Sequence, residues 1–225
     1  MIDAVVFDLD GVILQTEELW NEVRERFTRE RGGRWSDSAQ ADMMGMSSKE
    51  WSRYLHDELD VPVPPEEISR DVARRMAERY AESLPLIDGA VESVKRLAAR
   101  WPLGLASSAN RELIDRALEL SALAPYFHVT VSSEEVERGK PEPDVYLEAA
   151  KRLGVEATRC VAIEDSASGI RSAHAAGMLV VAIPNPDFPP PDEVVGLAAV
   201  KLDSIQELEP ETITEAARLS IASSD

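Results

Sequence analysis

Short apolar segments alternate with amphipathic ones over most of this chain, and this rhythm constrains the fold more than any other feature. The apolar segments are 4–7, 103–107, 128–133, 160–165, 179–183 and 198–203. The helical patterns between them are 89–100, 111–121, 143–154 and 167–177. Strands that alternate with amphipathic helices indicate a parallel sheet covered on both faces. We therefore predict an α/β fold built on a doubly wound parallel sheet.

Residues 17–84 have a different character, because they carry helical patterns and no β-branched run. Apolar residues recur every fourth position from Ile68 to Tyr80, and again from Leu19 to Phe27. Each set forms one face of a helix. We therefore expect an inserted helical domain at 16–84, called the cap here, in a core formed by 1–15 and 85–225. We expect short hinges near residues 15 and 85, on which the cap opens and closes.

Acidic residues dominate the composition. The 225-residue chain has 24 Lys and Arg against 42 Asp and Glu, a formal net charge of −18. Such a charge repels nucleic acid and anionic membrane surfaces, so we expect neither as a partner. It also repels phosphorylated metabolites, so a site for them needs a metal ion or local donors that make the electrostatic potential there positive.

Cellular location and cysteine use give weaker expectations. The N-terminus has no basic segment followed by an apolar one, and no run of about 18 apolar residues occurs, so we expect a cytoplasmic protein. The lone cysteine, Cys160, lies in an apolar run and is interpreted as a core residue. The histidines are too scattered for a zinc pattern, so a metal would need oxygen ligands. We expect a monomer or a weak homodimer.

Polar residues follow four of the predicted strands, and in open parallel sheets ligands bind outside the carboxyl ends of the strands. These strand-end residues are Asp8, Asp10, Ser107, Ser108, Ser132, Ser133, Glu164 and Asp165, and Lys140 follows the third of these strands in a proline-containing loop. Several acids with hydroxyls and one lysine suit Mg²⁺ together with an anion. A cation would let Asp8 and Asp165 stay ionised side by side, while Ser107 and Lys140 donate to the anion.

This set of residues predicts phosphoryl transfer, in which positioning and charge neutralisation supply most of the catalysis. One aspartate can attack phosphorus and form an aspartyl phosphate. An aspartate two residues further on can protonate the leaving oxygen and then activate water. Asp8 and Asp10 fit these two unequal roles, and Gly11 permits the sharp turn that separates their carboxylates.

The motifs resemble those of the haloacid dehalogenase superfamily. They are "DLDGV" after the first strand, "LASSAN" after the second, "GKPEPDVY" and "IEDSASGIRSAHAAGM". In order and spacing they span essentially the whole chain. They are most similar to the helical-cap subgroup that includes phosphoglycolate phosphatase-like enzymes and β-phosphoglucomutase.

The resemblance implies a role for each matching residue. Asp8 would be the nucleophile and a metal ligand, and Asp10 the acid and base whose carbonyl also binds Mg²⁺. Ser107, Ser108 and Lys140 would hold the transferring phosphoryl group. Asp165 would complete the metal site, with Glu164 either as a ligand or as a carboxylate that orients one.

The chain also departs from the subgroup's pattern. Gln15 replaces an acid, Trp20 replaces the histidine of mutase-like members, and Ser48 stands where the mutases have a basic residue, with Lys49 adjacent. The change at Gln15 weakens any role for that position, and the changes at Trp20 and Ser48 lean away from the mutase. We therefore expect a Mg²⁺-dependent phosphatase that acts on a small phosphorylated metabolite, such as a sugar phosphate or phosphoglycolate. A phosphosugar mutase and a non-catalytic phosphate-binding regulatory protein remain as alternatives. Asp10 disfavours dehalogenation, because the dehalogenases lack that residue. We expect the loop 45–49 and the helix around Trp20 to select the leaving group.

Overall fold

The computed structural model describes residues 1–186 and 188–222. Their strands form a six-stranded, all-parallel sheet in the order β3-β2-β1-β4-β5-β6. The strands are β1 (Ala4–Phe7), β2 (Leu103–Ser107), β3 (Phe127–Ser132), β4 (Cys160–Glu164), β5 (Leu179–Ala182) and β6 (Val200–Lys201). The predicted doubly wound α/β fold is thereby confirmed. Asp8 thus emerges from the middle of the sheet, because β1 lies between β2 and β4.

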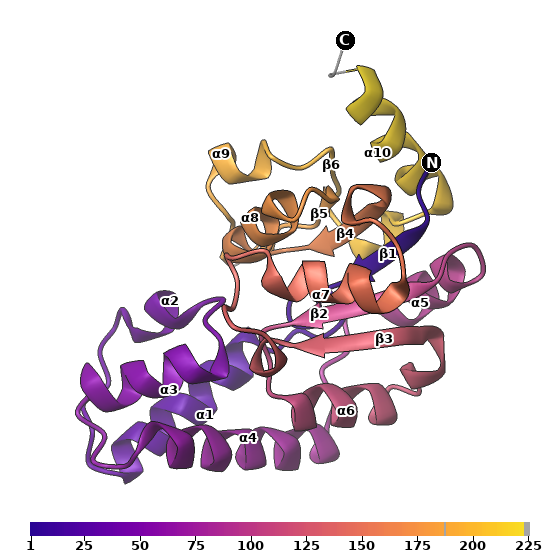
Figure 1. The fold of residues 1–225 in the computed structure, drawn as a ribbon. Coiled ribbons are helices and arrows are strands. Elements are labelled where there is room, and N and C mark those ends of the chain that lie inside the picture. Colours follow the sequence, from indigo (N-terminus) through magenta and orange to yellow (C-terminus); the bar gives the residue numbers. More distant parts are fainter. Residues whose placement is uncertain (187, 223–225) are drawn as a thin grey trace.

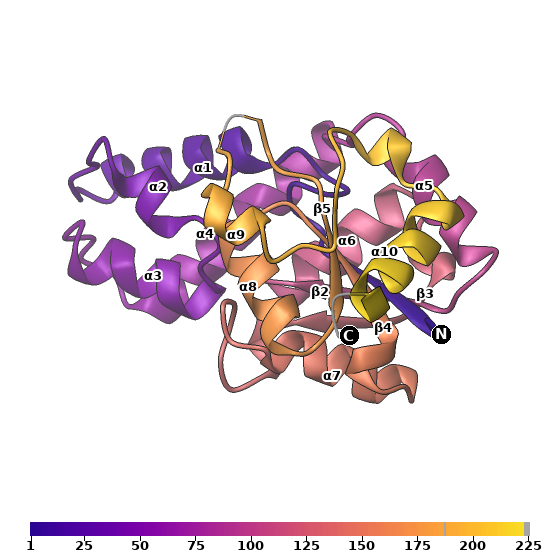
Figure 2. The same cartoon turned by 90° about the horizontal axis from the view of Figure 1, so that it is seen from above.

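Helices cover both faces of the sheet (Figure 2). The core helices are α5 (Ala90–Ala98), α6 (Arg111–Leu120), α7 (Asp144–Leu153), α8 (Ala167–Ala175), α9 (Asp192–Val195) and α10 (Pro210–Ala222). Val5 and Phe7 pack in the hydrophobic cluster of α5, α6 and α10, whereas Ala4 and Val6 pack in that of α7, α8 and α9. Successive side chains of a strand point to opposite faces, so a strand covered on both sides must be apolar throughout.

The structure corrects several predicted boundaries. The last strand contains only Val200–Lys201 rather than 198–203, and the third begins at Phe127 and ends at Ser132. The proline-rich segment 184–193, between β5 and β6, contains the start of α9 at Asp192; residue 187 lies outside the described residues. Helix α10 was not predicted.

The cap helices lie together on one side of the molecule (Figures 1 and 2). They are α1 (Glu17–Glu30), α2 (Ala39–Met43), α3 (Ser48–Asp57) and α4 (Pro65–Glu82). The two segments that join them to the sheet pair with each other: Gln15 N–H donates to Pro85 O at 2.8 Å, and Ile87 N–H to Ile13 O at 3.0 Å. Buried apolar residues of the cap and of one face of the sheet form a single cluster. The boundaries and the hinge motion of the cap stay predictions.

Two further observations bear on the sequence-based expectations. Cys160 is buried at the start of β4, as expected of a core residue, and burial raises the pKa of its thiol to about 11. None of the helices in 1–186 and 188–222 combines the length and the apolar character needed to cross a bilayer.

Candidate active site

The candidate site lies at the carboxyl ends of the central strands. Asp8 follows β1, Ser107 ends β2, and Glu164 ends β4, with Asp165 directly after it. The charged residues of the site are each at most 6% exposed: Asp8, Glu164, Asp165 and Lys140. Their charged groups are therefore almost completely removed from solvent. Burial of this kind needs partners, because an isolated buried charge is very costly.

Lys140 joins two of these acids. Its Nζ donates to Asp8 Oδ1 at 2.7 Å, to Glu164 Oε1 at 2.7 Å and to the Ala106 carbonyl at 3.1 Å. The three protons of the ammonium group therefore each have an acceptor. Burial lowers the pKa of Lys140, but the Asp8 and Glu164 carboxylates outweigh burial and raise it above its ordinary value. Lys140 is therefore a permanent positive charge at the site.

Glu164 is held by donors on both oxygens. Its Oε1 also accepts from Tyr146 Oη at 2.6 Å, and its Oε2 accepts from the backbone N–H of Asp165 at 3.1 Å and from Ser166 Oγ at 3.2 Å. Gly169 makes room for it, since a Cβ there would overlap the Glu164 carboxylate. This surrounds Glu164 with protein donors and fits a carboxylate that orients Lys140 and Asp165.

Asp165 is the acid best placed to hold a cation. It is 2% exposed, and its Oδ1 has no hydrogen-bond partner among the described residues. Ligand atoms of Asp8, Glu164 and Asp165 lie within 4.8 Å of one another. Gly11, at φ +83°, approaches so closely that a Cβ would lie on the Asp165 carboxylate. Hard oxygen ligands and an unpaired buried carboxylate fit a Mg²⁺ ion.

The electrostatics of Asp8 and Asp165 also fit a bound cation. Burial raises the pKa of Asp8 to about 8, with Lys140 opposing this and Glu164 and Asp10 adding to it. Burial and the neighbouring acids raise the pKa of Asp165 well above its ordinary value. Without a cation, protons compensate for this excess of acid, and a cation would replace them.

The serines at the strand ends have different surroundings. Ser107 is fully buried, and its Oγ accepts from the Ala109 N–H at 3.0 Å, whereas Ser108 lines the cavity in front of Asp8. Ser132 and Ser133 hold this loop, because their hydroxyls donate to the carbonyls of Ala109 and Ser108 at 2.6 and 3.0 Å. Ser107 thus shapes the loop, and phosphate binding by Ser107 and Ser108 stays a prediction.

Asp10 lies on the cap side of Asp8. Its Oδ1 accepts from Thr16 Oγ1 at 2.5 Å, so the Thr16 side chain, at the N-cap position of α1, contacts Asp10 rather than capping the helix. Burial raises the pKa of Asp10, and hydrogen bonds from Thr16 and Trp20 oppose the increase. The two aspartates therefore have distinct partners, Lys140 for Asp8 and the start of α1 for Asp10.

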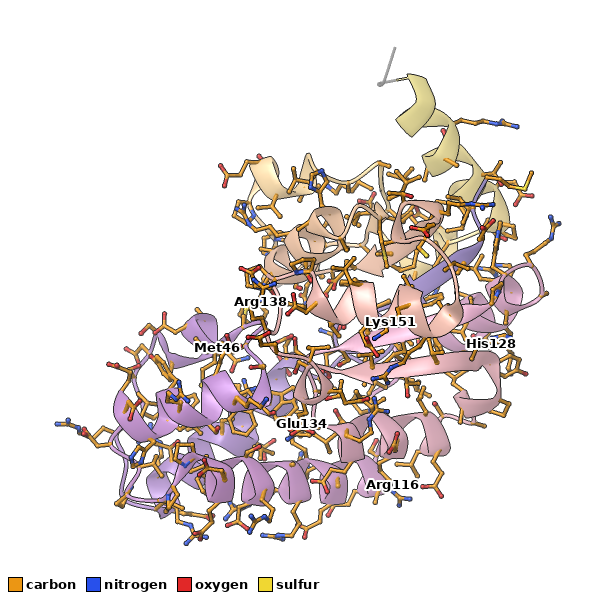
Figure 3. All side chains as sticks on the ribbon, in the orientation of Figure 1. Met46, Arg116, His128, Glu134, Arg138 and Lys151 are labelled. Carbon is orange, nitrogen blue, oxygen red and sulfur yellow. The ribbon has the colours of Figure 1, made fainter. Side chains whose placement is uncertain are left out.

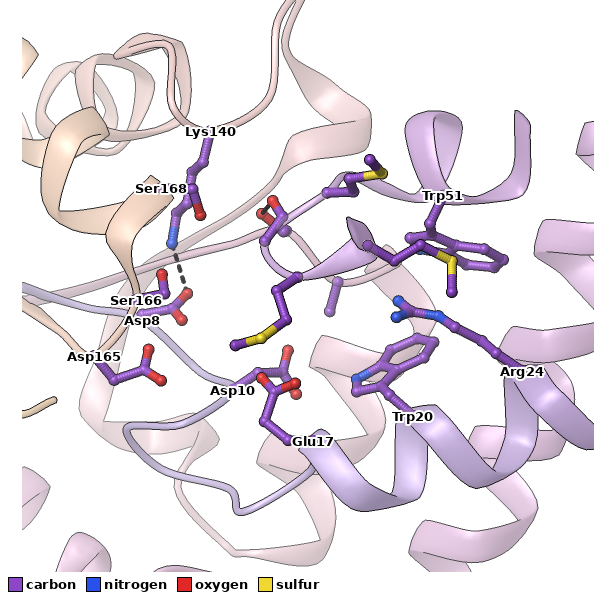
Figure 4. A pocket seen from close by; sticks show the side chains of 16 residues that line it. Asp8, Asp10, Glu17, Trp20, Arg24, Trp51, Lys140, Asp165, Ser166 and Ser168 are labelled. Atoms are coloured by element: carbon purple, nitrogen blue, oxygen red, sulfur yellow. Dashed lines mark hydrogen bonds and ion pairs between the residues drawn. The ribbon is translucent and has the colours of Figure 1, made fainter. Parts of the chain in front are cut away.

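A cavity of about 60 Å³ lies between these aspartates and the cap (Figure 4). Its core side includes Asp8, Asp10, Lys140 and Asp165, and its cap side includes Glu17, Trp20, Arg24, Met43, Met44, Gly45, Met46 and Trp51. Glu17, Trp20 and Arg24 share one face of α1, because residues three and four apart on a helix are neighbours. Sequence reasoning did not single out Thr16, Glu17, Arg24, Trp51 or Tyr146, although the spacing 17, 20, 24 was a usable signal.

A sequence model of the family described as "Haloacid dehalogenase-like hydrolase" matches residues 5–183, which is most of the chain. The chain belongs to this family. The matched range includes every catalytic, phosphate-binding and metal-binding residue predicted from the sequence. The expectation of an enzyme, a phosphatase of the haloacid dehalogenase-like family, is thereby confirmed.

Relatives of this haloacid dehalogenase-like protein are named as phosphatases. "Phosphorylated carbohydrates phosphatase" of Thermotoga maritima is 33% identical over 181 residues, covering 79% of this chain and 82% of the relative. "Hexitol phosphatase B" of Escherichia coli K12 is 32% identical over 225 residues, covering 91% and 93%. A solved β-phosphoglucomutase from Clostridium difficile superimposes with a TM-score of 0.84 over 99% of this chain and 100% of that one. At 22% identity it shows the fold alone.

The residues predicted to select the leaving group fall on two surfaces. Trp20, Gly45 and Met46 line the cavity, whereas Ser48 and Lys49 line a separate groove between the cap and α6. Ser48 Oγ donates to Glu134 Oε1 at 3.1 Å, and Glu134, labelled in Figure 3, lies on the core side of that groove. Gln15 is exposed and does not line the cavity.

Proposed function

We propose that this protein is a Mg²⁺-dependent phosphatase that hydrolyses a small phosphorylated metabolite through an aspartyl phosphate on Asp8. The observation that carries the proposal is the pairing of two unequal aspartates across one cavity. Asp8 is fixed by Lys140 at 2.7 Å, and Asp10 is fixed by Thr16 at 2.5 Å. The relatives' names, which refer to phosphorylated carbohydrates and hexitols, support a small phosphorylated substrate.

In the first half-reaction, a carboxylate oxygen of Asp8 forms a bond to phosphorus while the bond from phosphorus to the leaving oxygen breaks. Lys140 holds Asp8 in place and carries positive charge next to the phosphoryl group. Asp10 donates its proton to the leaving oxygen, which departs as a neutral hydroxyl group. The raised pKa of Asp10 fits a group that holds this proton.

In the second half-reaction, the now ionised Asp10 accepts a proton from water, and the resulting hydroxide attacks the phosphorus of the aspartyl phosphate. The bond to the Asp8 oxygen breaks, inorganic phosphate leaves, and both aspartates return to their starting states. Thr16 keeps the Asp10 carboxylate on the cap side for both steps.

Asp8, Asp165 and the Asp10 carbonyl would hold the Mg²⁺ ion. Glu164 would orient Lys140 and Asp165 through its hydrogen bonds to both. When bound, Mg²⁺ supplies positive charge that offsets the repulsion between the acidic residues and the incoming phosphate. Ser108 and Lys140 line the cavity and would bind phosphoryl oxygens. Ser107 would act through the backbone of the same loop.

The main alternative is a phosphosugar mutase, and two features weigh against it. Trp20 occupies the position of the mutase histidine and lines the cavity, and Ser48 is turned to Glu134 away from it. A non-catalytic phosphate-binding protein is disfavoured by the separate fixation of Asp8 and Asp10, because binding alone does not need an acid/base group.

The proposal is tested by measuring phosphate release from a panel of phosphorylated hydroxy acids, polyols and sugars, with and without Mg²⁺. We expect Mg²⁺-dependent release from at least one small ester, with turnover that needs no bisphosphate primer. Isomerised sugar phosphate without free phosphate would indicate the mutase. Phosphate binding without turnover of any ester would indicate the non-catalytic alternative.

We expect Mg²⁺ to stabilise the protein more at pH 8 than at pH 6. The raised pKa values favour protonated Asp8 and Asp165 in the metal-free protein. The stability that depends on the Asp8 proton is lost as the pH rises through the Asp8 pKa of about 8. Mg²⁺ needs the charged carboxylates, so its binding is stronger where they lose protons. At a free concentration of about 100 Kd it adds ~2.7 kcal/mol, or roughly 5–11 °C in Tm for a chain of this size.

Calorimetry of matched variants checks this prediction. Asp165→Asn should lose most of the Mg²⁺-dependent Tm increase and its pH dependence, together with activity. Asp88→Asn, which changes an exposed acid away from the cavity, should retain both. An unchanged Mg²⁺ response in Asp165→Asn would exclude this residue as a ligand.

A further inference from the structure

Arg24 is a buried cation inside the cavity for which the proposed reaction has no use. It lies on α1 and is 6% exposed. Its guanidinium contacts two indole rings, with its central carbon 4.4 Å from the Trp20 centroid and 4.9 Å from that of Trp51 (Figure 4). The two rings lie 5.9 Å apart at 56° and fix the guanidinium through cation–π contacts. These ring contacts do not use the N–H donors along the edge of the guanidinium.

That edge has no partner among the described residues. The Nε of Arg24 is buried without a hydrogen bond, and within 1–186 and 188–222 no carboxylate oxygen lies within 4.0 Å of the guanidinium. Seven other cap arginines do form ion pairs: Arg26, Arg29, Arg31, Arg34, Arg74, Arg75 and Arg79. Arg75 is the closest comparison, because it also stacks on a ring, Phe27 at 5.2 Å, yet it contacts Glu30 at 2.7 Å.

A buried cation without an ion pair is costly unless an anion joins it in the working state. Burial lowers the pKa of Arg24 to about 10, with Glu17 and Asp10 opposing the decrease, so the guanidinium stays charged at neutral pH. The planar N–H edge matches the two oxygens of a carboxylate. Arg24 thus presents a charged donor set to the cavity from the side opposite Asp8 and Lys140.

We infer that Arg24 binds a carboxylate on the leaving group, so that the preferred substrates are small phosphorylated hydroxy acids. The inference rests on the proposed phosphatase function, because the phosphoryl group must lie at Asp8 for the other end of the ester to reach Arg24. The cavity of about 60 Å³ lies between the two ends of such a substrate, with Asp8 on one side and Arg24 on the other.

The test compares esters that differ in one group, 2-phosphoglycolate and 2-hydroxyethyl phosphate. For the native enzyme we expect kcat/KM to be about 10- to 100-fold higher for the acid, the usual effect of a charge-assisted pair of hydrogen bonds. Arg24→Met should lower this ratio at least tenfold. Arg24→Lys, which keeps the charge but loses the planar fork, should give an intermediate ratio. Arg75→Met, which removes the ion-paired stacked arginine, should keep the native ratio.

The outcomes separate this inference from the proposed function. Phosphate release from the panel, combined with a native ratio of one or less, would overturn the role of Arg24 and leave the phosphatase intact. Equal decreases in kcat/KM for both esters in Arg24→Met and Arg24→Lys would also overturn it. Such a result would mean that Arg24 stabilises the cap and does not bind the leaving group. If Arg24→Met does not fold, the native and Arg24→Lys ratios decide. No release from any panel member would refute the proposed function itself.

Discussion

Replacing Asp8 with Asn should lower kcat by about four to six orders of magnitude, the usual cost of removing an enzyme's nucleophile. An amide oxygen is a far poorer nucleophile than a carboxylate, and the change also removes one ligand of the proposed Mg²⁺ site. No phosphoryl group should then appear on this residue. Acid-quenched mixtures analysed by mass spectrometry measure both effects, since the native enzyme should carry one phosphoryl group on the peptide that contains Asp8.

The fold should survive this change, which makes the result interpretable. Lys140 keeps Glu164 as an ion-pair partner at 2.7 Å, so its charge stays compensated. Asp3→Asn is a suitable control, because Asp3 lies before the same strand and pairs with Arg159 on the exposed side. A phosphoryl group at residue 8 in a protein shown to contain Asn, without deamidation, would refute the assignment of the nucleophile.

The sheet could be predicted because its strands are buried on both faces. Their apolar runs are short, bounded and separated by amphipathic helices, and each of these signals is local. The missed elements lack such signals. Helix α2 has only five residues, too few for a periodic pattern. Helix α10 contains Thr212 and Thr214, which have low helix propensity. The last strand was predicted, but β6 is shorter than 198–203, because an edge strand pairs with only one neighbour.

The acids of the site could be predicted for a related reason, because polar residues that end buried strands must meet at one edge of a parallel sheet. The residues on helices that contact these acids or line the cavity could not be predicted. Tyr146 contacts Glu164 from the first turn of α7, and Arg24 contacts Trp51 across the cap. These contacts depend on how helices pack, which strand order alone does not determine. The burial of Ser107, with Ser108 facing the cavity, likewise follows from the turn after β2.

Replacing Asp10 with Asn should lower kcat by about 10²–10⁴-fold, the usual contribution of a general acid and base. The loss in the first half-reaction should depend on the substrate, because a leaving group of low pKa departs without a proton. For p-nitrophenyl phosphate, Asp8 should therefore still become phosphorylated. For an alkyl phosphate, phosphorylation itself should be slow. The second half-reaction lacks its base with either substrate, so the phosphoenzyme formed from the aryl ester should accumulate.

Single-turnover kinetics with both substrates measures these effects, and Thr16→Val provides a matched control. Valine has nearly the shape of threonine but cannot donate to Asp10 Oδ1, so this variant keeps the carboxylate and removes only its fixation at 2.5 Å. We expect Thr16→Val to lose less activity than Asp10→Asn and to accumulate less phosphoenzyme, because a mobile Asp10 can still accept a proton. If Asp10→Asn slowed phosphorylation by aryl and alkyl esters equally, Asp10 would not be the proton donor. Its carboxylate would then act by holding the cap or the metal site in place.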